Sequence, residues 1–355
     1  MVRWRGRQGA GPIGVDLGSR SIKMVQLTAD RTRIREAVCW DLPTTARSDA
    51  AARTRQLAHA LAAAREGRTF RGRDAVFCLG TTELFLQNMR VAQATGDQLR
   101  QVVEKEAASR LPFDSEQAEL RFYEADTVRQ GDAFRREVIV LACQKPSVHG
   151  LLAVAEAARL NPVAIDAAPA ALLRCYSSQF RRSTDDDASV LFMSIGASCT
   201  TVVIARGDNP RFIKQVDFGG RQLDEAVSRD LKMKLADAVA LRRHNGDRRA
   251  DRRDPEIAES IVKATRPLME SMANDLAMCM RYYSVTFRGQ PLLRVVVGGG
   301  RGVVGPGGVA FDTAGHSVRI GGSVAVLPGV DVAGSEHPMG RRDRPSLARG
   351  EVKTT

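Results

Sequence analysis

The sequence has few aromatic residues, only five histidines and only six cysteines, and none of the cysteines shows a Cys-x-x-Cys spacing. Such dispersed cysteines and histidines exclude a disulfide framework and a zinc site, and reduced cysteines are typical of the cytosol. No uncharged run reaches the length of about 20 residues that a transmembrane helix needs. The basic first residues lack the apolar core of a secretory signal. We therefore expect a cytoplasmic protein without zinc, which needs a partner to hold it at a membrane.

Positive charge is in excess, with 53 lysines and arginines against 41 acidic residues and a formal net charge of +12. Much of the excess lies at the two ends and in segment 242–254. These basic runs lack interleaved aromatic residues, and no helix-turn-helix or RNA-binding module is recognisable, so nucleic-acid binding is not expected. The plain interpretation is solvated tails and a flexible loop. The alternative is contact with an anionic membrane surface.

An internal repeat is the most informative feature of the chain. Residues 13–42 and residues 191–220 align without gaps at a constant offset of 178, which places Gly18 on Gly196. Each copy predicts three antiparallel strands, joined first by a glycine turn and then by a polar turn. Two such copies in register indicate a duplicated domain.

Glycine turns of this kind can bind phosphate, because they expose backbone N–H groups and allow a ligand to approach closely. Two opposed turns would hold a polyphosphate between two lobes, and Asp16 would hold magnesium through water. A third glycine cluster follows the apolar strand at 295–297 and fits a turn against a nucleoside. The predicted phosphate-binding residues are Gly18, Ser19, Arg20, Ser21, Lys23, Gly196, Ala197, Ser198, Cys199 and Thr200, and the predicted nucleoside-side residues are Gly219, Gly220, Gly298, Gly299 and Gly300.

These three motifs, in this order, resemble the actin-like ATPase superfamily, which includes actin, Hsp70, sugar kinases and FtsA. Segment 84–126 is similar to the small inserted subdomain of the type IV pilus assembly protein PilM family, in which a helix ending in Leu-Pro-Phe precedes a strand with acidic and aromatic residues. Segments 138–176 and 212–243 are similar to the stretches that follow in that family. The resemblance extends from about residue 11 to about residue 305.

The resemblance implies an α/β fold of the actin-like, duplicated ribonuclease H-like type, with two lobes and an inserted α+β subdomain. The expected parts are a basic tail at 1–10, a first lobe at 11–85 and 163–188, the inserted subdomain at 86–162, a second lobe at 189–330 with a helical part at 223–288, and a polar arginine-rich tail at 331–355. Apolar periodicity predicts helices at 98–111, from 223 to 235, and at 255–283. Pro267 either kinks the last helix or divides it into two.

Three departures from the family pattern imply a degenerate ATP-binding cleft. The family usually has an acidic residue at the end of the strand in both repeats, but Ser194 replaces the second one. Ala168 stands where relatives place a glutamate that positions the attacking water for phosphoryl transfer. If this segment is a strand, Asp166 shares a face with Ala168 at a different depth. After Gly300 the chain lacks the helix start of the family. Weak binding of ATP and magnesium is therefore expected, with slow or absent hydrolysis.

The resemblance implies a cytoplasmic scaffold of a type IV pilus or of related secretion machinery such as type II secretion. Its partner would be a PilN-like inner-membrane protein, whose N-terminal cytoplasmic tail it docks, so that it lies peripherally at the inner membrane. The first alternative is an active actin-like ATPase that works as a switch. The second is a small-molecule kinase, which would need a carboxylate base that Asp74 and Asp114 do not obviously provide. The third is an FtsA-like polymer, although the C-terminal tail lacks the expected amphipathic membrane helix.

Overall fold

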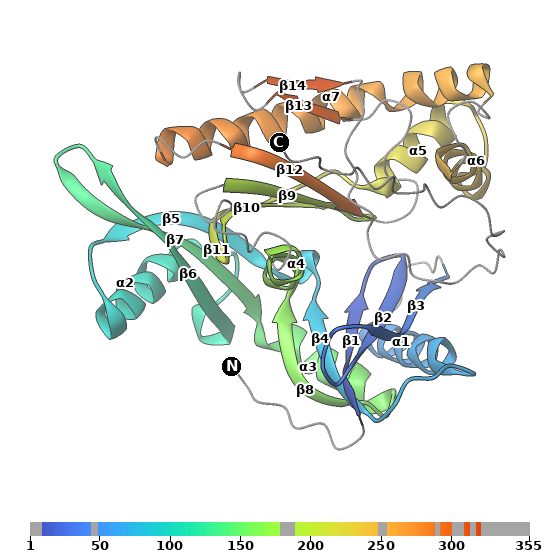
Figure 1. Ribbon diagram of the computed structural model, residues 1–355, viewed down its shortest axis with the longest axis horizontal. Coiled ribbons are helices and arrows are strands. Elements are labelled where there is room, and N and C mark those ends of the chain that lie inside the picture. The colour runs from blue at the N-terminus through green and yellow to red at the C-terminus, as the bar shows by residue number, and fades with distance from the viewer. Residues whose placement is uncertain are drawn as a thin grey trace, which may run out of the picture.

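The computed structural model describes residues 9–43, 49–177, 189–247, 254–287, 292–299, 309–312 and 317–320. Gly300, the first eight residues and the C-terminal tail lie outside these ranges. The described strands form two large sheets, a three-stranded sheet and a two-stranded hairpin. Figure 1 shows the four-stranded sheet above the five-stranded sheet, with helix α4 (Ala168–Ser177) between them and the three-stranded sheet to one side.

The first lobe contains the five-stranded sheet, whose order is β3-β2-β1-β4-β8. Strands β1 to β3 are antiparallel, and β4 and β8 extend the sheet in parallel with β1. Helices α1 (Ala50–Arg65) and α3 (Lys145–Ala157) pack together against this sheet in one apolar core. The strands are β1 (Ala10–Leu17), β2 (Ser21–Thr28), β3 (Ile34–Asp41), β4 (Asp74–Leu79) and β8 (Asn161–Ala167), and a short 3-10 turn, η1 (Thr81–Glu83), follows β4.

The second lobe contains the four-stranded sheet, whose order is β11-β10-β9-β12. Its central strand β9 is almost entirely buried, as its continuous apolar sequence requires. The long helix α7 (Pro255–Thr286) covers the sheet, and Asp254 caps this helix by accepting hydrogen bonds from Glu256 and Ile257. The other elements are β9 (Ser189–Ile195), β10 (Thr200–Arg206), β11 (Asn209–Val216), β12 (Leu292–Gly299), α5 (Gly220–Asp230), α6 (Leu235–Asp247), and the hairpin β13 (Val309–Asp312) and β14 (Ser317–Ile320).

The repeat appears in both sheets, because β1-β2-β3 and β9-β10-β11 form the same antiparallel meander. The strand pattern expected for each copy is thus confirmed, and the two copies lie in separate sheets. Asp16 pairs with Lys23 across the first copy, and Ser194 pairs with Thr201 across the second. These pairs correspond to each other at the offset of 178.

The inserted part is the three-stranded sheet β5-β7-β6, with helix α2 packed against it. Helix α2 (Gly96–Ala108) confirms the helix expected at 98–111, and its buried residues include Leu99 and Val103. The strands are β5 (Phe85–Ala92), β6 (Ala118–Gln130) and β7 (Ala133–Gln144), with a 3-10 turn η2 (Ser115–Gln117) before β6. The long β6-β7 hairpin extends away from the two lobes in Figure 1.

The structure settles three points about the expected helices, namely the helix from 223 to 235, the effect of Pro267 and the conformation at Ala168. The single helix expected from 223 to 235 is wrong, because Lys232 adopts a φ of 50° and separates α5 from α6. Helix α7 continues through Pro267 and is one helix. Ala168 begins α4, so the condition under which Asp166 and Ala168 would share a strand face is not met.

Candidate functional site

The two glycine turns have the same internal geometry. In the first, Gly18 N–H donates to the carbonyl of Ser21 at 3.1 Å, and in the second, Gly196 N–H donates to the carbonyl of Cys199 at 2.9 Å. A Cβ atom on either glycine would lie 2.8 Å from that carbonyl oxygen. The closed shape of each turn is therefore enough to require glycine, with or without a ligand.

The structure brings these two turns into contact. The hydroxyls of Ser19 and Ser198 lie 3.3 Å apart, although the residues are 179 positions apart in the sequence. Beside them, Thr81 Oγ1 lies 2.7 Å from Cys199 Sγ, and Gln215 Nε2 donates to the Thr81 carbonyl at 2.7 Å. We call this region, formed by turns 18–21 and 196–199 together with the start of α5, the interlobe junction.

The first N–H groups of α5 are turned toward the second glycine turn. Gly220 N–H donates to the Gly196 carbonyl at 3.0 Å, and Arg221 N–H donates to the Ala197 carbonyl at 2.8 Å. The backbones are so close that a Cβ on Gly219 would lie 2.7 Å from atoms of Ala197. A helix N-terminus offers its free N–H groups to anions, but here protein carbonyls already occupy two of them.

The glycines of β12 lie against protein atoms. A Cβ on Gly298 would lie 2.8 Å from the Tyr176 hydroxyl, and a Cβ on Gly299 would lie 2.5 Å from the Ile195 carbonyl. Tyr176 itself stacks on Phe192, with ring centroids 5.7 Å apart. These glycines therefore allow β12 to lie close to Tyr176 of α4 and to Ile195 of β9.

Thr200, the last predicted residue of the second turn, is fully buried, and its hydroxyl donates a hydrogen bond to the Phe218 carbonyl at 2.8 Å.

Asp16, the predicted magnesium residue, forms an ion pair with Lys23, whose Nζ lies 2.8 Å from Asp16 Oδ2. Burial is the largest single effect and lowers the pKa of the Lys23 amine, but the charge and hydrogen bond of Asp16, together with the nearby Cys39 and Cys78, raise it, and the net shift of the pKa is upward. In the second lobe the corresponding residues are Ser194 and Thr201, which face each other across β9 and β10. The second repeat therefore has neither the acid nor its cation at these positions.

A second acid, Asp166, lies in register with Asp16 across the first sheet, with Cys78 of β4 between them. Its carboxylate accepts hydrogen bonds from Arg174 of α4 and from the N–H of Ala167. Burial, followed by the nearby Asp16 charge, raises the pKa of the Cys78 thiol to about 12. Both acids of this row are therefore neutralised by a cation of their own lobe.

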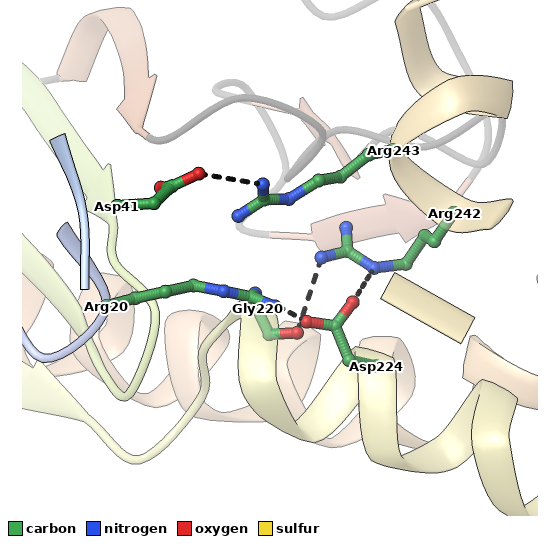
Figure 2. Close-up of polar contacts among 6 residues, drawn as sticks. All are labelled: Arg20, Asp41, Gly220, Asp224, Arg242 and Arg243. Atoms are coloured by element: carbon green, nitrogen blue, oxygen red, sulfur yellow. Dashed lines mark hydrogen bonds and ion pairs between the residues drawn. The ribbon is translucent and has the colours of Figure 1, made fainter. Parts of the chain in front are cut away.

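A cluster of charges that the sequence did not reveal also joins the lobes (Figure 2). Arg20 Nη1 of the first turn lies 2.6 Å from Asp224 Oδ2 of α5, and Arg242 Nε of α6 lies 2.7 Å from Asp224 Oδ1. Asp224 is 1% exposed and Arg242 is 5% exposed. Arg243 Nη1 lies 3.7 Å from Asp41 Oδ2 at the end of β3. The sequence did contain one signal of this cluster: Asp224 falls on the apolar face of α5, beside Leu223 and Val227, where a carboxylate needs a buried partner.

The expected ligand is a nucleoside triphosphate with magnesium, and in this arrangement the residues that would hold it are already paired with one another. Arg20 and Lys23 are bound to Asp224 and Asp16, and the Ser19 and Ser198 hydroxyls are within hydrogen-bonding distance of each other. A triphosphate between the turns would have to break these contacts. Within the described ranges, no three His, Cys, Asp or Glu residues form a group that could hold a metal ion.

Comparisons with known proteins identify the relatives of this architecture. A family model described as type IV pilus assembly protein PilM matches residues 14–307. The structure of a PilM-PilN type IV pilus biogenesis complex is similar to this chain, with a TM-score of 0.67 and 22% identity over 82% of this chain and 81% of that chain. The ethanolamine utilization protein EutJ from Carboxydothermus hydrogenoformans has a TM-score of 0.46 and 13% identity over 81% of this chain and 76% of that chain. The expected actin-like fold is confirmed.

No helix in the described part of the chain is both long enough and apolar enough to span a membrane.

Proposed function

The chain belongs to the PilM family of type IV pilus assembly proteins, and we propose that it is a cytoplasmic scaffold that docks the N-terminal cytoplasmic tail of a PilN-like inner-membrane protein. The family match over residues 14–307 carries this proposal. The likeness to a PilM-PilN complex supports it, because the similarity covers about four fifths of both chains. The protein would then lie peripherally at the inner membrane and serve a pilus or a related machine such as type II secretion.

The contacts between the inserted sheet and the second lobe support a scaffold, because a docking surface needs a fixed shape. The Asn88 side chain of β5 donates to the Ile213 carbonyl at 2.7 Å and accepts from the Ile213 N–H at 3.3 Å. Arg211 Nη1 of β11 lies 3.0 Å from Asp126 Oδ2 of β6. Contacts to backbone atoms and a partly buried ion pair restrict sliding and rotation of one sheet on the other.

A buried carboxylate makes a second connection between these parts. Glu137 of β7 is fully buried, and its carboxylate accepts hydrogen bonds from Arg90 Nε at 2.9 Å and from the Tyr282 hydroxyl of α7. Arg90 also donates to Thr286 Oγ1 at 3.0 Å. This network joins the inserted sheet to the helix that covers the second sheet, so we propose that the inserted part and the second lobe move as one body.

We propose further that ATP and magnesium bind weakly and that hydrolysis is slow or absent. The internal partners of Arg20 and Lys23 compete with phosphate oxygens for the same donors. Ser194 cannot supply a second negative charge for the metal, and Ala168 can neither orient a water molecule nor accept its proton. Arg242 and Arg243 have partners within the protein, and the later arginines of segment 242–254 would add a weak contact with an anionic membrane surface.

A pull-down tests the docking role. The N-terminal cytoplasmic tail of a PilN-like inner-membrane protein from the same organism is immobilised as a peptide and incubated with the purified full chain. We expect retention of the chain on this peptide and none on a scrambled peptide of the same composition. Equal retention on both peptides, or none on either, would contradict the docking role.

A further inference from the structure

We propose that Asp224 is an internal anionic ligand of the first glycine turn and that the Arg20–Asp224 contact latches the two lobes together without nucleotide. The inference concerns regulation of the proposed degenerate cleft and rests on the proposed function in that respect. Figure 2 shows Arg20 reaching from the first lobe to a carboxylate that Arg242 holds from the other side. The carboxylate takes the place at Arg20 that a phosphate oxygen would occupy at a working phosphate turn.

The burial of Asp224 explains why its carboxylate has to be paired with a cation. A carboxylate that is 1% exposed must be paired, because an unpaired buried charge is strongly unfavourable. Arg242 satisfies this need from within the second lobe through Nε, and it also donates from Nη2 to the Gly220 carbonyl at 3.4 Å. Arg20 therefore forms a second ion pair with Asp224, at 2.6 Å, and this pair connects the first lobe to the second. This pair joins residues 204 positions apart.

The internal repeat shows that the turn itself does not need an arginine. At the offset of 178, Arg20 falls on Ser198, and the second turn closes with the same Gly N–H to carbonyl bond as the first. The arginine is thus an addition to a turn that closes without it. Its side chain is directed to the other lobe, which is what a latch requires.

A second ion pair lies next to the first. Arg243 follows Arg242 on α6, and its guanidinium lies 3.7 Å from Asp41 at the end of β3. Two consecutive arginines of α6 thus approach Asp224 and Asp41, and the second of these contacts again joins the two lobes (Figure 2). Each of these two arginines therefore has an acid close by, and Asp224 is shared between Arg242 and Arg20.

Disulfide trapping across the two turns tests the latch. Because the hydroxyls of Ser19 and Ser198 lie 3.3 Å apart, the double variant Ser19→Cys/Ser198→Cys should form a disulfide only while the lobes are closed. Cys199→Ser is added so that the new cysteines cannot pair with the native thiol, and its hydroxyl keeps the contact with Thr81. The full chain, without nucleotide, is oxidised with oxidised glutathione, and the cross-linked peptide is quantified over time by mass spectrometry.

The decisive comparison is Arg20→Gln against Arg229→Gln in this background. Both remove one positive charge, but Arg229 is an exposed residue at the end of α5. Asp224 keeps Arg242 in the Arg20→Gln variant, so the buried charge stays paired. We expect Arg20→Gln to slow cross-linking at least about fivefold and Arg229→Gln to leave it unchanged. Equal rates in the two variants would overturn the latch.

Salt provides a second measurement that does not depend on the variant folding well. Added sodium chloride screens ion pairs that reach solvent, and the Arg20 side chain is 30% exposed. Cross-linking with Arg20 present should therefore slow as salt rises, and a rate that does not change with salt would count against an ionic latch. Retention of the same proteins on the PilN-like tail peptide is measured in parallel. Intact retention with no difference in cross-linking would overturn the latch while leaving the docking role standing.

Discussion

The amine of Lys23 lies 2.8 Å from the carboxylate of Asp16, and the residues that correspond to them in the second repeat are Thr201 and Ser194. The first lobe has kept an ion pair where the second lobe has two hydroxyls. Since both charged side chains are about half exposed, with 49% and 47% of their surfaces accessible, this pair has little effect on folding stability. The pair matters because Lys23 occupies the Asp16 carboxylate that a magnesium ion would need.

Replacing Asp16 by alanine tests the metal role. We expect the free energy of unfolding to change by less than about 1 kcal/mol, because the pair is exposed to solvent. We also expect the weak heat of ATP binding in magnesium, measured by isothermal titration calorimetry, to disappear. Lys23→Ala is the matched control, because it removes the cation and frees the carboxylate. Binding heat that survives in Asp16→Ala would remove Asp16 from the metal site.

Replacing Gly219 by alanine tests the close approach of α5 to the second turn. The new Cβ would lie 2.7 Å from backbone atoms of Ala197 and Ser198, which cannot move without opening the turn. We expect the free energy of unfolding, measured in urea, to fall by about 1–3 kcal/mol. Gly150→Ala in α3 is the control, because its Cβ meets nothing within 4 Å, and alanine there should stabilise the helix by up to about 1 kcal/mol. A neutral Gly219→Ala variant would show that the turn is free to move.

Replacing Glu137 by alanine tests the connection between the inserted sheet and the second lobe. The change leaves Arg90 and the Tyr282 hydroxyl without their shared acceptor, and we expect destabilisation of about 3 kcal/mol. Glu124→Gln is the control, because Glu124 is itself exposed and lies 3.7 Å from the half-buried Arg136, and loss of this weak pair should change stability by less than about 1 kcal/mol. If both variants unfold at the same urea concentration, the buried network does not hold these parts together.

The pH dependence of stability should reveal the burial of Cys279 in α7. Burial raises the pKa of this thiol to about 11; the nearby Lys214 lowers it and Asp275 raises it. The neutral thiol is therefore favoured in the folded state. The stability from this group is fully present below about pH 9, the ordinary value, and is lost as the pH rises through 11.

We therefore expect the free energy of unfolding to decrease between pH 9 and pH 11, with a contribution from Cys279 of at most about 1.4 kcal/mol per pH unit. Cys279→Ala should reduce this slope in urea titrations at several pH values, and Cys39→Ala, at an exposed position, should leave it as in the unchanged protein. An unchanged slope in Cys279→Ala would mean that the thiol titrates alike in both states.

Local features of the fold could be predicted from the sequence. The repeated meanders followed from alternating apolar residues and from turns rich in glycine, aspartate and asparagine, and helix α2 followed from its apolar spacing. The break between α5 and α6 could not be predicted, because it occurs at Lys232 in a stretch without glycine or proline.

The candidate site was predicted only in part, because its residues come from distant segments. The glycine turns were found through the repeat, and the structure brings Ser19 and Ser198 together. The partners of Arg20 and Lys23 decide whether these donors are available to a ligand. The Lys23 partner is the residue opposite it in a hairpin, whereas the Arg20 partner is 204 positions away, and no local pattern reports such a pair.

The most direct test of the account is the affinity of the full chain for the fluorescently labelled PilN-like tail peptide, measured by anisotropy with and without ATP and magnesium. A scaffold whose lobes are held together by its own side chains should bind the peptide without nucleotide, and its dissociation constant should change by less than about twofold when nucleotide is added, which is below about 0.4 kcal/mol. Binding that appears only with ATP and magnesium would contradict the account.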